Sequence, residues 1–317
     1  MGKLISIGEM LIDFTGGARG TLDSVNTFKK NPGGAPANVA VCAARLGGKV
    51  LFITKLGEDA FGRYLVNVLK KNGVDISAVK VTKRANTPLA FVTLDRQGER
   101  DFSFYRNPSS DLFLESGEIE RDYFATGDIL HFCSVDLVDF PVKDAHRTAI
   151  RYAQDAGMLI SFDPNLRCAL WSDANEMLTT VREFVPYCHI LKMSVEELRE
   201  IGGYDERAAL KNLFVGSVKI IIVTDGKNGA CAYFYCGERI EVKPPVVAQI
   251  DATGAGDAFV GALLVQLLSD KKTPDNLLSD KKAFERYLTF ANKTAALCVT
   301  KRGAIPAMPS YADVFLC

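Results

Sequence analysis

The chain has 317 residues, of which 48% are hydrophobic and 24% charged, a composition that excludes a disordered, collagen-like or coiled-coil protein. Its 38 basic residues balance 38 acidic ones, so no net charge attracts nucleic acid or an acidic membrane surface. At roughly 150 residues per domain, the length allows two domains, or one large α/β domain with an appendage.

The cysteines and histidines indicate neither a disulfide framework nor a metal centre. The eight cysteines show no C-x-x-C spacing and the three histidines no H-x-x-x-H spacing. Glu9 and Asp13 interrupt the first apolar stretch, which argues against a signal peptide, and the uncharged run 258–269 is too short to span a bilayer. We therefore expect a cytoplasmic protein with reduced thiols and no membrane partner.

Apolar runs and helical patterns alternate along most of the chain. The predicted strands are residues 3–7, 50–54, 129–132, 158–162, 189–192 and 219–224. The predicted helices are residues 36–46, 61–72, 142–156 and 208–215. This alternation predicts an α/β fold in which a mostly parallel sheet carries helices on both faces and binds ligands at the carboxyl ends of its strands.

Two stretches depart from the βαβ pattern. Residues 11–31 are polar and rich in glycine and threonine, and residues 87–106 alternate between apolar and polar around a predicted turn at 96–99. We predict that these two stretches form a small antiparallel β lid over the active site, although a hairpin without function fits the pattern as well. The whole chain, 1–317, then forms one domain with this lid.

The first glycine cluster is Asn31-Pro32-Gly33-Gly34-Ala35-Pro36-Ala37-Asn38, which opens a predicted helix. Adjacent glycines allow a ligand to approach the backbone, and the Asn38 amide can donate to and accept from a polyol. The cluster predicts sugar binding, while a glycine turn that merely starts a helix is the alternative.

The second cluster is Asp251-Ala252-Thr253-Gly254-Ala255-Gly256-Asp257, followed by an apolar helical run. Small residues before a helix expose its first amide groups, and Gly254, Ala255 and Gly256 are therefore candidates to stabilise a phosphoryl group. Asp257 is a candidate general base, or else an ordinary acidic residue of a first helical turn. The chain lacks the P-loop motif and the dinucleotide fingerprint.

Together the two clusters resemble the signatures of the ribokinase family of sugar kinases, Gly-Gly-x-x-x-Asn and Asp-Thr-x-Gly-Ala-Gly-Asp, with Ala252 in place of the usual threonine. The resemblance extends from Gly8-Glu9 to Gly303-Ala304 and implies a ribokinase-like fold with ATP, Mg²⁺ and possible K⁺ as cofactors. Within the family, segments 104–111 and 162–167 are similar to those of fructokinases. 2-Keto-3-deoxygluconate kinases carry related arginines and remain the alternative.

The resemblance also implies roles for single residues. Asp13 accepts hydrogen bonds from sugar hydroxyls. Arg106 and Arg167 bring positive charge to the substrate, unless they form structural ion pairs. The nucleotide side consists of Lys192, Glu196, Thr224, Gly226, Gly229 and Asn292. In this alignment the N-x-x-E motif of the family falls on Met193 and Glu196. Asp251, Thr253 and Gly303 match the monovalent-cation site.

These expectations combine into one function: phosphorylation of fructose to fructose 6-phosphate by ATP, with Asp257 as the general base. A catalytically silent sugar sensor and a nicotinamide oxidoreductase are alternatives of other classes. The lid also suggests a homodimer if an apolar face of its sheet is exposed.

Overall fold

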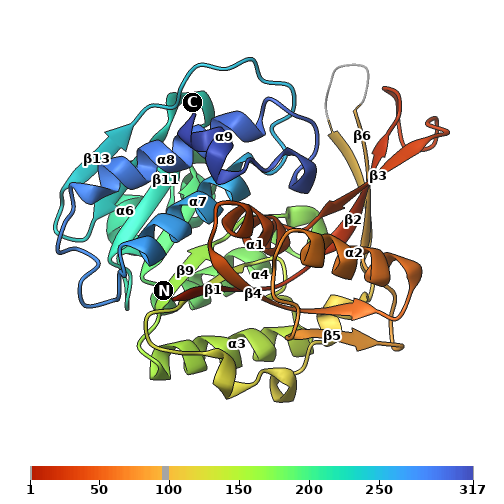
Figure 1. Cartoon of the computed structure of the whole chain (residues 1–317), viewed down its shortest axis with the longest axis horizontal. Helices are drawn as coiled ribbons and strands as arrows, with labels where there is room; N and C mark the ends of the chain where they lie inside the picture. The colour runs from red at the N-terminus through yellow and green to blue at the C-terminus, as the bar shows by residue number, and fades with distance from the viewer. Residues whose placement is uncertain (1, 95–99, 317) are drawn as a thin grey trace.

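The computed structural model describes residues 2–94 and 100–316 and is built around a large central sheet (Figure 1). In the described residues this sheet has nine strands, in the order β13-β12-β11-β10-β9-β8-β1-β4-β5. Their bounds are β1 Lys3–Ile7, β4 Lys49–Gly57, β5 Val79–Thr82, β8 Ile129–Cys133, β9 Leu159–Asp163, β10 Ile190–Ser194, β11 Ile220–Thr224, β12 Ala230–Phe234 and β13 Arg239–Val242. The strands from β11 to β5 pair in parallel, and β12 and β13 add an antiparallel edge.

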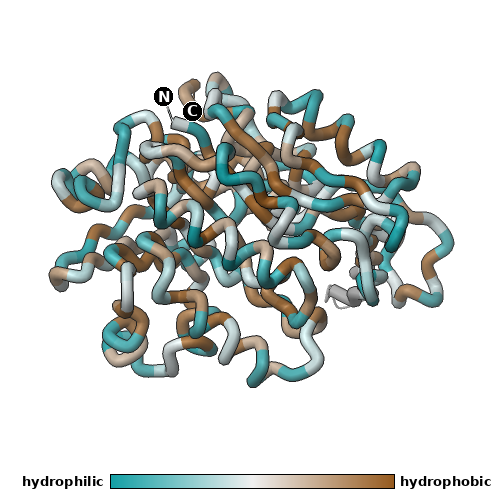
Figure 2. The backbone as a smooth tube through the Cα atoms, turned by 90° about the horizontal axis from the view of Figure 1, so that it is seen from below, coloured by the Kyte–Doolittle hydropathy of each residue, from teal (hydrophilic) through white to brown (hydrophobic). Residues whose placement is uncertain are grey.

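Helices cover both faces of this sheet. One face carries α1 (Ala35–Arg45), α2 (Ala60–Lys71), α7 (Ala255–Ser269) and α8 (Ala283–Cys298), and short α9 (Tyr311–Phe315) contacts α8. The other carries α3 (Pro141–Asp155), α4 (Ala174–Phe184), α5 (Val195–Gly202) and α6 (Glu206–Leu213). Side chains alternate along each strand, so that Leu4 packs in the first core and Ile5 in the second. Figure 2 shows apolar segments through the interior and polar ones in many outer turns.

Helix α7 lies between its neighbours α1 and α8, and most of its residues are buried. Its closest approach to α1 is at Gly261, where a Cβ atom would lie 2.9 Å from the Cβ of Cys42. The helix starts after Gly254, whose φ of 80° favours glycine and where a Cβ would lie 2.9 Å from the Cβ of Ala304. These glycines let α7 sit deep in the molecule with its first turn at the edge of the sheet.

A second, smaller sheet projects from the upper right of Figure 1 and has the order β3-β2-β6-β7. Its strands are β2 Leu11–Gly16, β3 Phe28–Gly33, β6 Leu89–Leu94 and β7 Arg100–Tyr105. The outer pairs are antiparallel as expected, whereas the central pair, β2 with β6, is parallel. This parallel pair arises because β2 and β6 follow β1 and β5, parallel strands that end at the same edge of the large sheet. The turn predicted at 96–99 lies outside the described residues.

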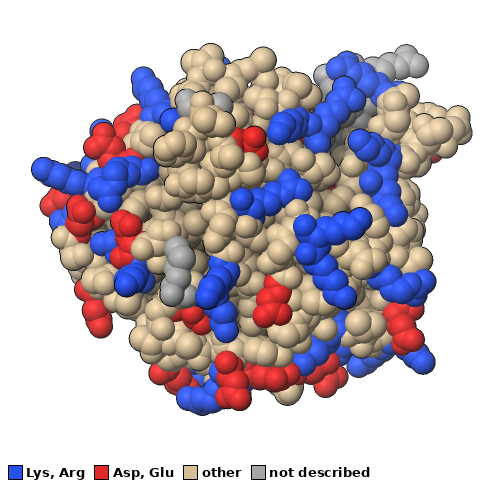
Figure 3. Space-filling view, in the orientation of Figure 1, with Lys and Arg blue, Asp and Glu red and all other residues tan. Residues whose placement is uncertain are grey.

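The predicted fold class is confirmed, and each predicted strand and helix is present with ends within two residues, except that β4 is longer. Sequence reasoning did not predict β5, β12, β13, α4, α5 or α9. No helix in the described part of the chain is long and apolar enough to cross a membrane. Basic and acidic side chains are both spread over the face in Figure 3, which agrees with the zero net charge.

Candidate active site

A cavity of about 670 Å³ opens where the carboxyl ends of the parallel strands meet the small sheet and the first turns of α1 and α7. Parallel α/β sheets bind ligands at this edge. Its lining includes Asp13 on β2, Gly34 before α1, Asn38 on α1, Asp163 on β9, Lys192 on β10, Thr224 on β11, and Gly254, Gly256 and Asp257 at the start of α7.

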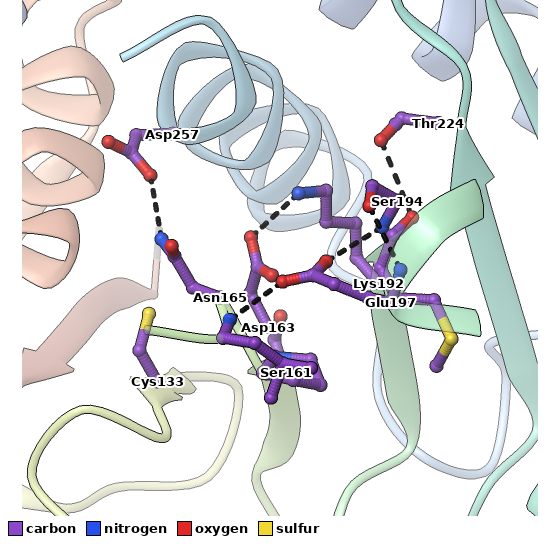
Figure 4. Close-up of polar contacts among 12 residues, drawn as sticks. Cys133, Ser161, Asp163, Asn165, Lys192, Ser194, Glu197, Thr224 and Asp257 are labelled. Carbon is purple, nitrogen blue, oxygen red and sulfur yellow. Dashed lines mark hydrogen bonds and ion pairs between the residues drawn. The ribbon is translucent and has the colours of Figure 1, made fainter. Parts of the chain in front are cut away.

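Asp257 lies in the first turn of α7, and its side chain is held from two sides. The Asn38 amide donates to Oδ2 over 2.8 Å. The Asn165 amide donates to Oδ1 over 3.4 Å (Figure 4). Burial raises the pKa of Asp257 to about 6, and the nearby negative charge of Asp163 acts in the same direction. A carboxylate with this pKa is ionised at neutral pH and can still accept a proton readily.

The first turn of α7 places Gly254 and Gly256 at the cavity where we predicted an anion-binding surface, whereas Ala255 is outside the lining and its amide donates to the Ala252 carbonyl over 3.3 Å. Amide groups of a first helical turn have no partner within the helix and carry the positive end of its dipole. The ammonium of Lys192 adds a full charge there, because a Cβ at Gly256 would lie only 3.2 Å from its Nζ atom. The surface therefore combines backbone amides and one cation beside Asp257.

Lys192 is paired with Asp163 across neighbouring strands, at 2.8 Å between Nζ and Oδ2, with both side chains buried (Figure 4). Burial alone would lower the pKa of Lys192, but the charges of Asp163 and Glu197 outweigh it and raise that pKa. The other carboxylate oxygen of Asp163, Oδ1, is buried and has no hydrogen-bond partner. This ion pair therefore borders the cavity, and the Oδ1 atom of Asp163 is available to accept a further hydrogen bond.

Sequence reasoning missed Asp163, Asn165 and Glu197 as site residues. Glu197 accepts from the amides of Leu166 (2.7 Å) and Ser194 (2.8 Å), whereas Glu196, the predicted glutamate, is exposed at the cavity rim. Ser194-x-x-Glu197 forms a capping box at the start of α5, and this local pattern could have identified the inward-facing glutamate.

Of the residues predicted for the sugar site, Asp13, Gly34 and Asn38 line one wall of the cavity, and Gly33 packs against Asp13 outside the lining set. A Cβ at Gly33 would lie 2.1 Å from Asp13 Oδ2, and Gly34 has a φ of 105° with its Cα closely packed on Glu9 and Met10. Only glycine fits both positions. The Oδ1 atom of Asn38 is buried without a hydrogen-bond partner, so it is available to a ligand hydroxyl.

The two arginines differ. Arg167 is exposed, lines the cavity and donates to the Leu166 carbonyl over 2.8 Å. The Arg106 guanidinium is buried and forms ion pairs with Asp111 and Asp136. Of the two predictions made for Arg106, the geometry favours the structural ion pair.

A second cavity of about 420 Å³ adjoins the first and shares Phe104 and Leu170 with it. Arg106 and the aromatic rings of Phe140 and Trp171 belong to its lining. The Nε1 atom of Trp171 is buried without a hydrogen-bond partner.

The predicted nucleotide residues are spread more widely. Thr224 lines the main cavity, and its hydroxyl donates to the Met193 carbonyl over 3.4 Å. Gly226 and Gly229 form a tight turn after β11, and the Asn292 amide on α8 donates to the Val242 carbonyl over 2.9 Å. These last three residues are outside the set that lines the main cavity.

The three predicted cation residues lie together beside α7. Asp251 Oδ1 accepts from the amide (3.0 Å) and hydroxyl (2.6 Å) of Thr253, and its Oδ2 accepts from the amide of Gly303 (2.9 Å). The described residues contain no group of three or more His, Cys, Asp or Glu side chains able to hold a metal ion.

Comparisons with known proteins agree with this architecture. The pfkB family of carbohydrate kinases matches residues 1–310, and the chain belongs to that family. "Probable fructokinase-5" of Arabidopsis thaliana is 42% identical over 98% of this chain and 95% of its own length. "Fructokinase-1" of Oryza sativa is 43% identical, over 98% and 96%.

Two solved structures have the same ribokinase-like fold. The fructokinase from Xylella fastidiosa with bound ATP superposes with a TM-score of 0.92 at 34% identity, covering 99% of this chain and 97% of its own. A fructokinase from Vibrio cholerae with fructose, ADP and calcium gives 0.89 at 33% identity, covering 100% and 98%.

Proposed function

We propose that the protein transfers the terminal phosphoryl group of ATP to fructose and forms fructose 6-phosphate. The observation that carries this proposal is the buried Asp257 carboxylate, which two asparagine amides aim into the cavity beside the first turn of α7. The fructokinase names of the similar proteins support fructose as the acceptor, as does the fructose bound in the Vibrio structure.

In the proposed reaction, Asp257 accepts the proton of the attacking sugar hydroxyl. The amides of Gly254, Ala255 and Gly256, with the Lys192 ammonium, stabilise charge on the transferred phosphoryl group. Asp13, Gly33, Gly34 and Asn38 bind and orient the sugar. Closure of the small sheet over the cavity excludes water that would otherwise hydrolyse ATP.

We propose Mg²⁺ as the companion of ATP, because carboxylate oxygens suit this ion and Asp163 offers a buried oxygen without a partner. Asp163 and Glu197 would hold its water ligands, and the ion would neutralise phosphate charge.

The ATP side consists of Lys192, Glu196, Thr224, Gly226, Gly229 and Asn292. The loop joined by Asp251, Thr253 and Gly303 is the proposed potassium site; comparing ATP KM in K⁺ with that in Na⁺ tests it.

The two arginines bear on whether the sugar is neutral or acidic. 2-Keto-3-deoxygluconate carries a carboxylate, whose binding favours an unpaired guanidinium. Arg106 is already neutralised by Asp111 and Asp136, which leaves Arg167 as the arginine that lines the main cavity among the described residues. The choice of fructose over the acidic alternative therefore rests on the fructokinase names of the similar proteins, and Arg167 is the residue that tests it.

A panel of sugars, assayed for ADP release with ATP and Mg²⁺, tests the proposal. We expect kcat/KM for fructose to exceed that for 2-keto-3-deoxygluconate at least tenfold, a difference of about 1.4 kcal/mol or more. The reverse preference would overturn the choice of substrate. Sugar binding without ADP release from any member of the panel would favour a sugar sensor.

We further propose a cytoplasmic homodimer that associates through the small sheet. Tyr105 is 63% exposed, and its ring makes an edge contact with the ring of Phe91. The Phe91 ring also contacts the rings of Phe14 and Phe28. The seven described cysteines are free thiols, which suits a reducing compartment. Sedimentation of the wild type and of Tyr105→Ser measures whether this aromatic surface joins two copies.

A further inference from the structure

Four buried charged residues lie where the small sheet joins the large one, and we call them the hinge cluster: Glu9, Arg106, Asp111 and Asp136. Glu9 lies between β1 and β2, where the chain enters the small sheet, and Arg106 directly follows β7, where the chain leaves it. Asp136 follows β8, which is a strand of the large sheet. The cluster therefore connects two of the four attachment points of the small sheet to the core.

Arg106 makes the connection on the exit side. Its Nε donates to Asp111 Oδ2 over 2.8 Å, and one terminal nitrogen donates to the Val135 carbonyl over 3.1 Å. The other terminal nitrogen pairs with both Asp111 and Asp136. Because the planar guanidinium uses all its nitrogens in this way, it fixes the end of β7 against the end of β8.

Glu9 belongs to the lining of the main cavity and makes the connection to the sugar wall. Its Oε1 accepts from the amide of Ala35 over 2.8 Å, and its backbone carbonyl lies 2.5 Å from where a Cβ of Gly34 would be. Ala35 begins α1, which carries Asn38, and the preceding Gly33 contacts Asp13. The Glu9 side chain thus sets the turn on which the proposed sugar ligands depend.

The charges in the hinge cluster do not balance if every group is ionised. Three carboxyls face one guanidinium at sites that are at most 8% exposed, and an uncompensated buried charge is strongly unfavourable. Burial, and then the charge of Asp136, raise the pKa of Glu9 well above its usual value. Burial also raises the pKa of Asp136 above its usual value. Protonation of Glu9 and Asp136 leaves Asp111 to pair with Arg106, and a neutral Glu9 still accepts from the Ala35 amide.

We propose that Glu9 and Arg106 are positioning residues of the acceptor site, whose buried cluster holds the small sheet and the Gly33–Ala35 turn in the geometry that binds the sugar. This inference deepens the proposed function and rests on it for the choice of fructose as acceptor. It assigns to the Tyr105-Arg106-Asn107-Pro108-Ser109-Ser110-Asp111 segment a role in shaping the site, without contact with substrate.

Glu9→Gln and Glu9→Ala separate this role from others. Glutamine keeps the acceptor for the Ala35 amide without a charge, so we expect both KM values and kcat within about threefold of wild type. Alanine removes the acceptor, and we expect the fructose KM to rise about tenfold while the ATP KM stays within about threefold. Glu58→Ala, at an exposed glutamate, is the matched control. Equal damage from Glu9→Gln and Glu9→Ala, or damage from neither, would overturn the proposal.

Arg106 is tested by a double-mutant cycle of Arg106→Lys with Glu9→Ala, with Arg147→Lys as the control at an exposed arginine. Two residues that act through one cluster give effects on fructose KM that do not multiply. Independent, fully multiplicative effects would mean that Arg106 contacts the sugar directly and would overturn its positioning role.

Amide hydrogen exchange over residues 33–38 provides a readout without turnover. We expect faster exchange at Ala35 in Glu9→Ala and wild-type exchange in Glu9→Gln; unchanged exchange in Glu9→Ala would refute the role of Glu9. If the wild type fails to phosphorylate fructose, the proposed function fails, while the exchange experiment still decides whether Glu9 orders the turn.

Discussion

The acceptor side and the nucleotide side of the cavity are built differently. On the acceptor side, Asn38, Asn165 and Asp257 are each at most 8% exposed, and both asparagine amides donate to Asp257. On the nucleotide side, Lys192 is also buried, but Glu196 is exposed at the cavity rim, and Gly226, Gly229 and Asn292 are outside the cavity lining. The acceptor side is therefore preorganised around Asp257, whereas bound ATP must itself connect the scattered residues of the nucleotide side.

The largest effect should come from the centre of the preorganised side. Asp257→Asn keeps the shape of the side chain but cannot accept the hydroxyl proton, so we expect kcat to fall by roughly 10²–10⁴. ADP release measures kcat, and calorimetry should show that ATP still binds. Asp122→Asn, at an exposed position, is the control. Turnover within threefold of wild type would reduce Asp257 to a residue of the first helical turn.

Asp13→Ala should affect the acceptor side alone. Loss of a charged partner for sugar hydroxyls costs about 1.5–3 kcal/mol, so we expect the fructose KM to rise roughly 10- to 150-fold with little change in the ATP KM. Gly33→Ala should act in the same direction, because its Cβ would lie 2.1 Å from Asp13 Oδ2. Asp23→Ala, in the exposed connection between β2 and β3, is the control. Equal changes in both KM values would place the defect outside the sugar site.

The pH profile tests the same carboxylate without mutation. Since burial raises the pKa of Asp257 to about 6, its base form is lost as the pH falls below 6. We expect kcat/KM for fructose to decline there by about tenfold per pH unit. A flat profile between pH 7 and 5 in the wild type would contradict the proposed base. The residual activity of Asp257→Asn should lack this acid limb.

Glu197 and Glu196 form a matched pair on the nucleotide side. Glu197 bonds two backbone amides beside Lys192, so we expect Glu197→Gln to lower kcat/KM for ATP about tenfold. Glu196→Gln should change it less than threefold, because exposed charges contribute little. Titration with ATP at fixed fructose gives both numbers. The opposite ranking would favour Glu196, the glutamate on which the N-x-x-E motif falls.

The smallest effect is expected at Arg167, which is exposed at the cavity wall. With neutral fructose, Arg167→Ala should lower kcat only severalfold and leave the fructose KM within about threefold. The measurement is repeated at two salt concentrations. A collapse of sugar affinity that depends on salt would show that the substrate carries a carboxylate paired with Arg167.

Local pattern predicted the fold well because the strands and helices carry their own apolar periodicity. It also predicted the clusters at Gly33, Gly34 and Asp257. Small residues at the start of a helix leave its first amide groups accessible, and this pattern is visible in the local sequence alone. Asp163 could not be found in this way, since its role depends on Lys192 from a neighbouring strand. The parallel pairing of β2 with β6 likewise follows from distant strands, and a hairpin pattern does not predict it.

Trp171 gives the second cavity a property that no other residue supplies. It is the single tryptophan of the chain, and it lines the wall beside Phe104 of the small sheet. Its indole N–H is buried without a partner, so a change in the polarity or hydration of this cavity acts directly on the fluorophore. The protein thus contains its own optical probe: emission excited in the indole band would report the proposed closure of the small sheet over the acceptor, in unlabelled protein and in real time.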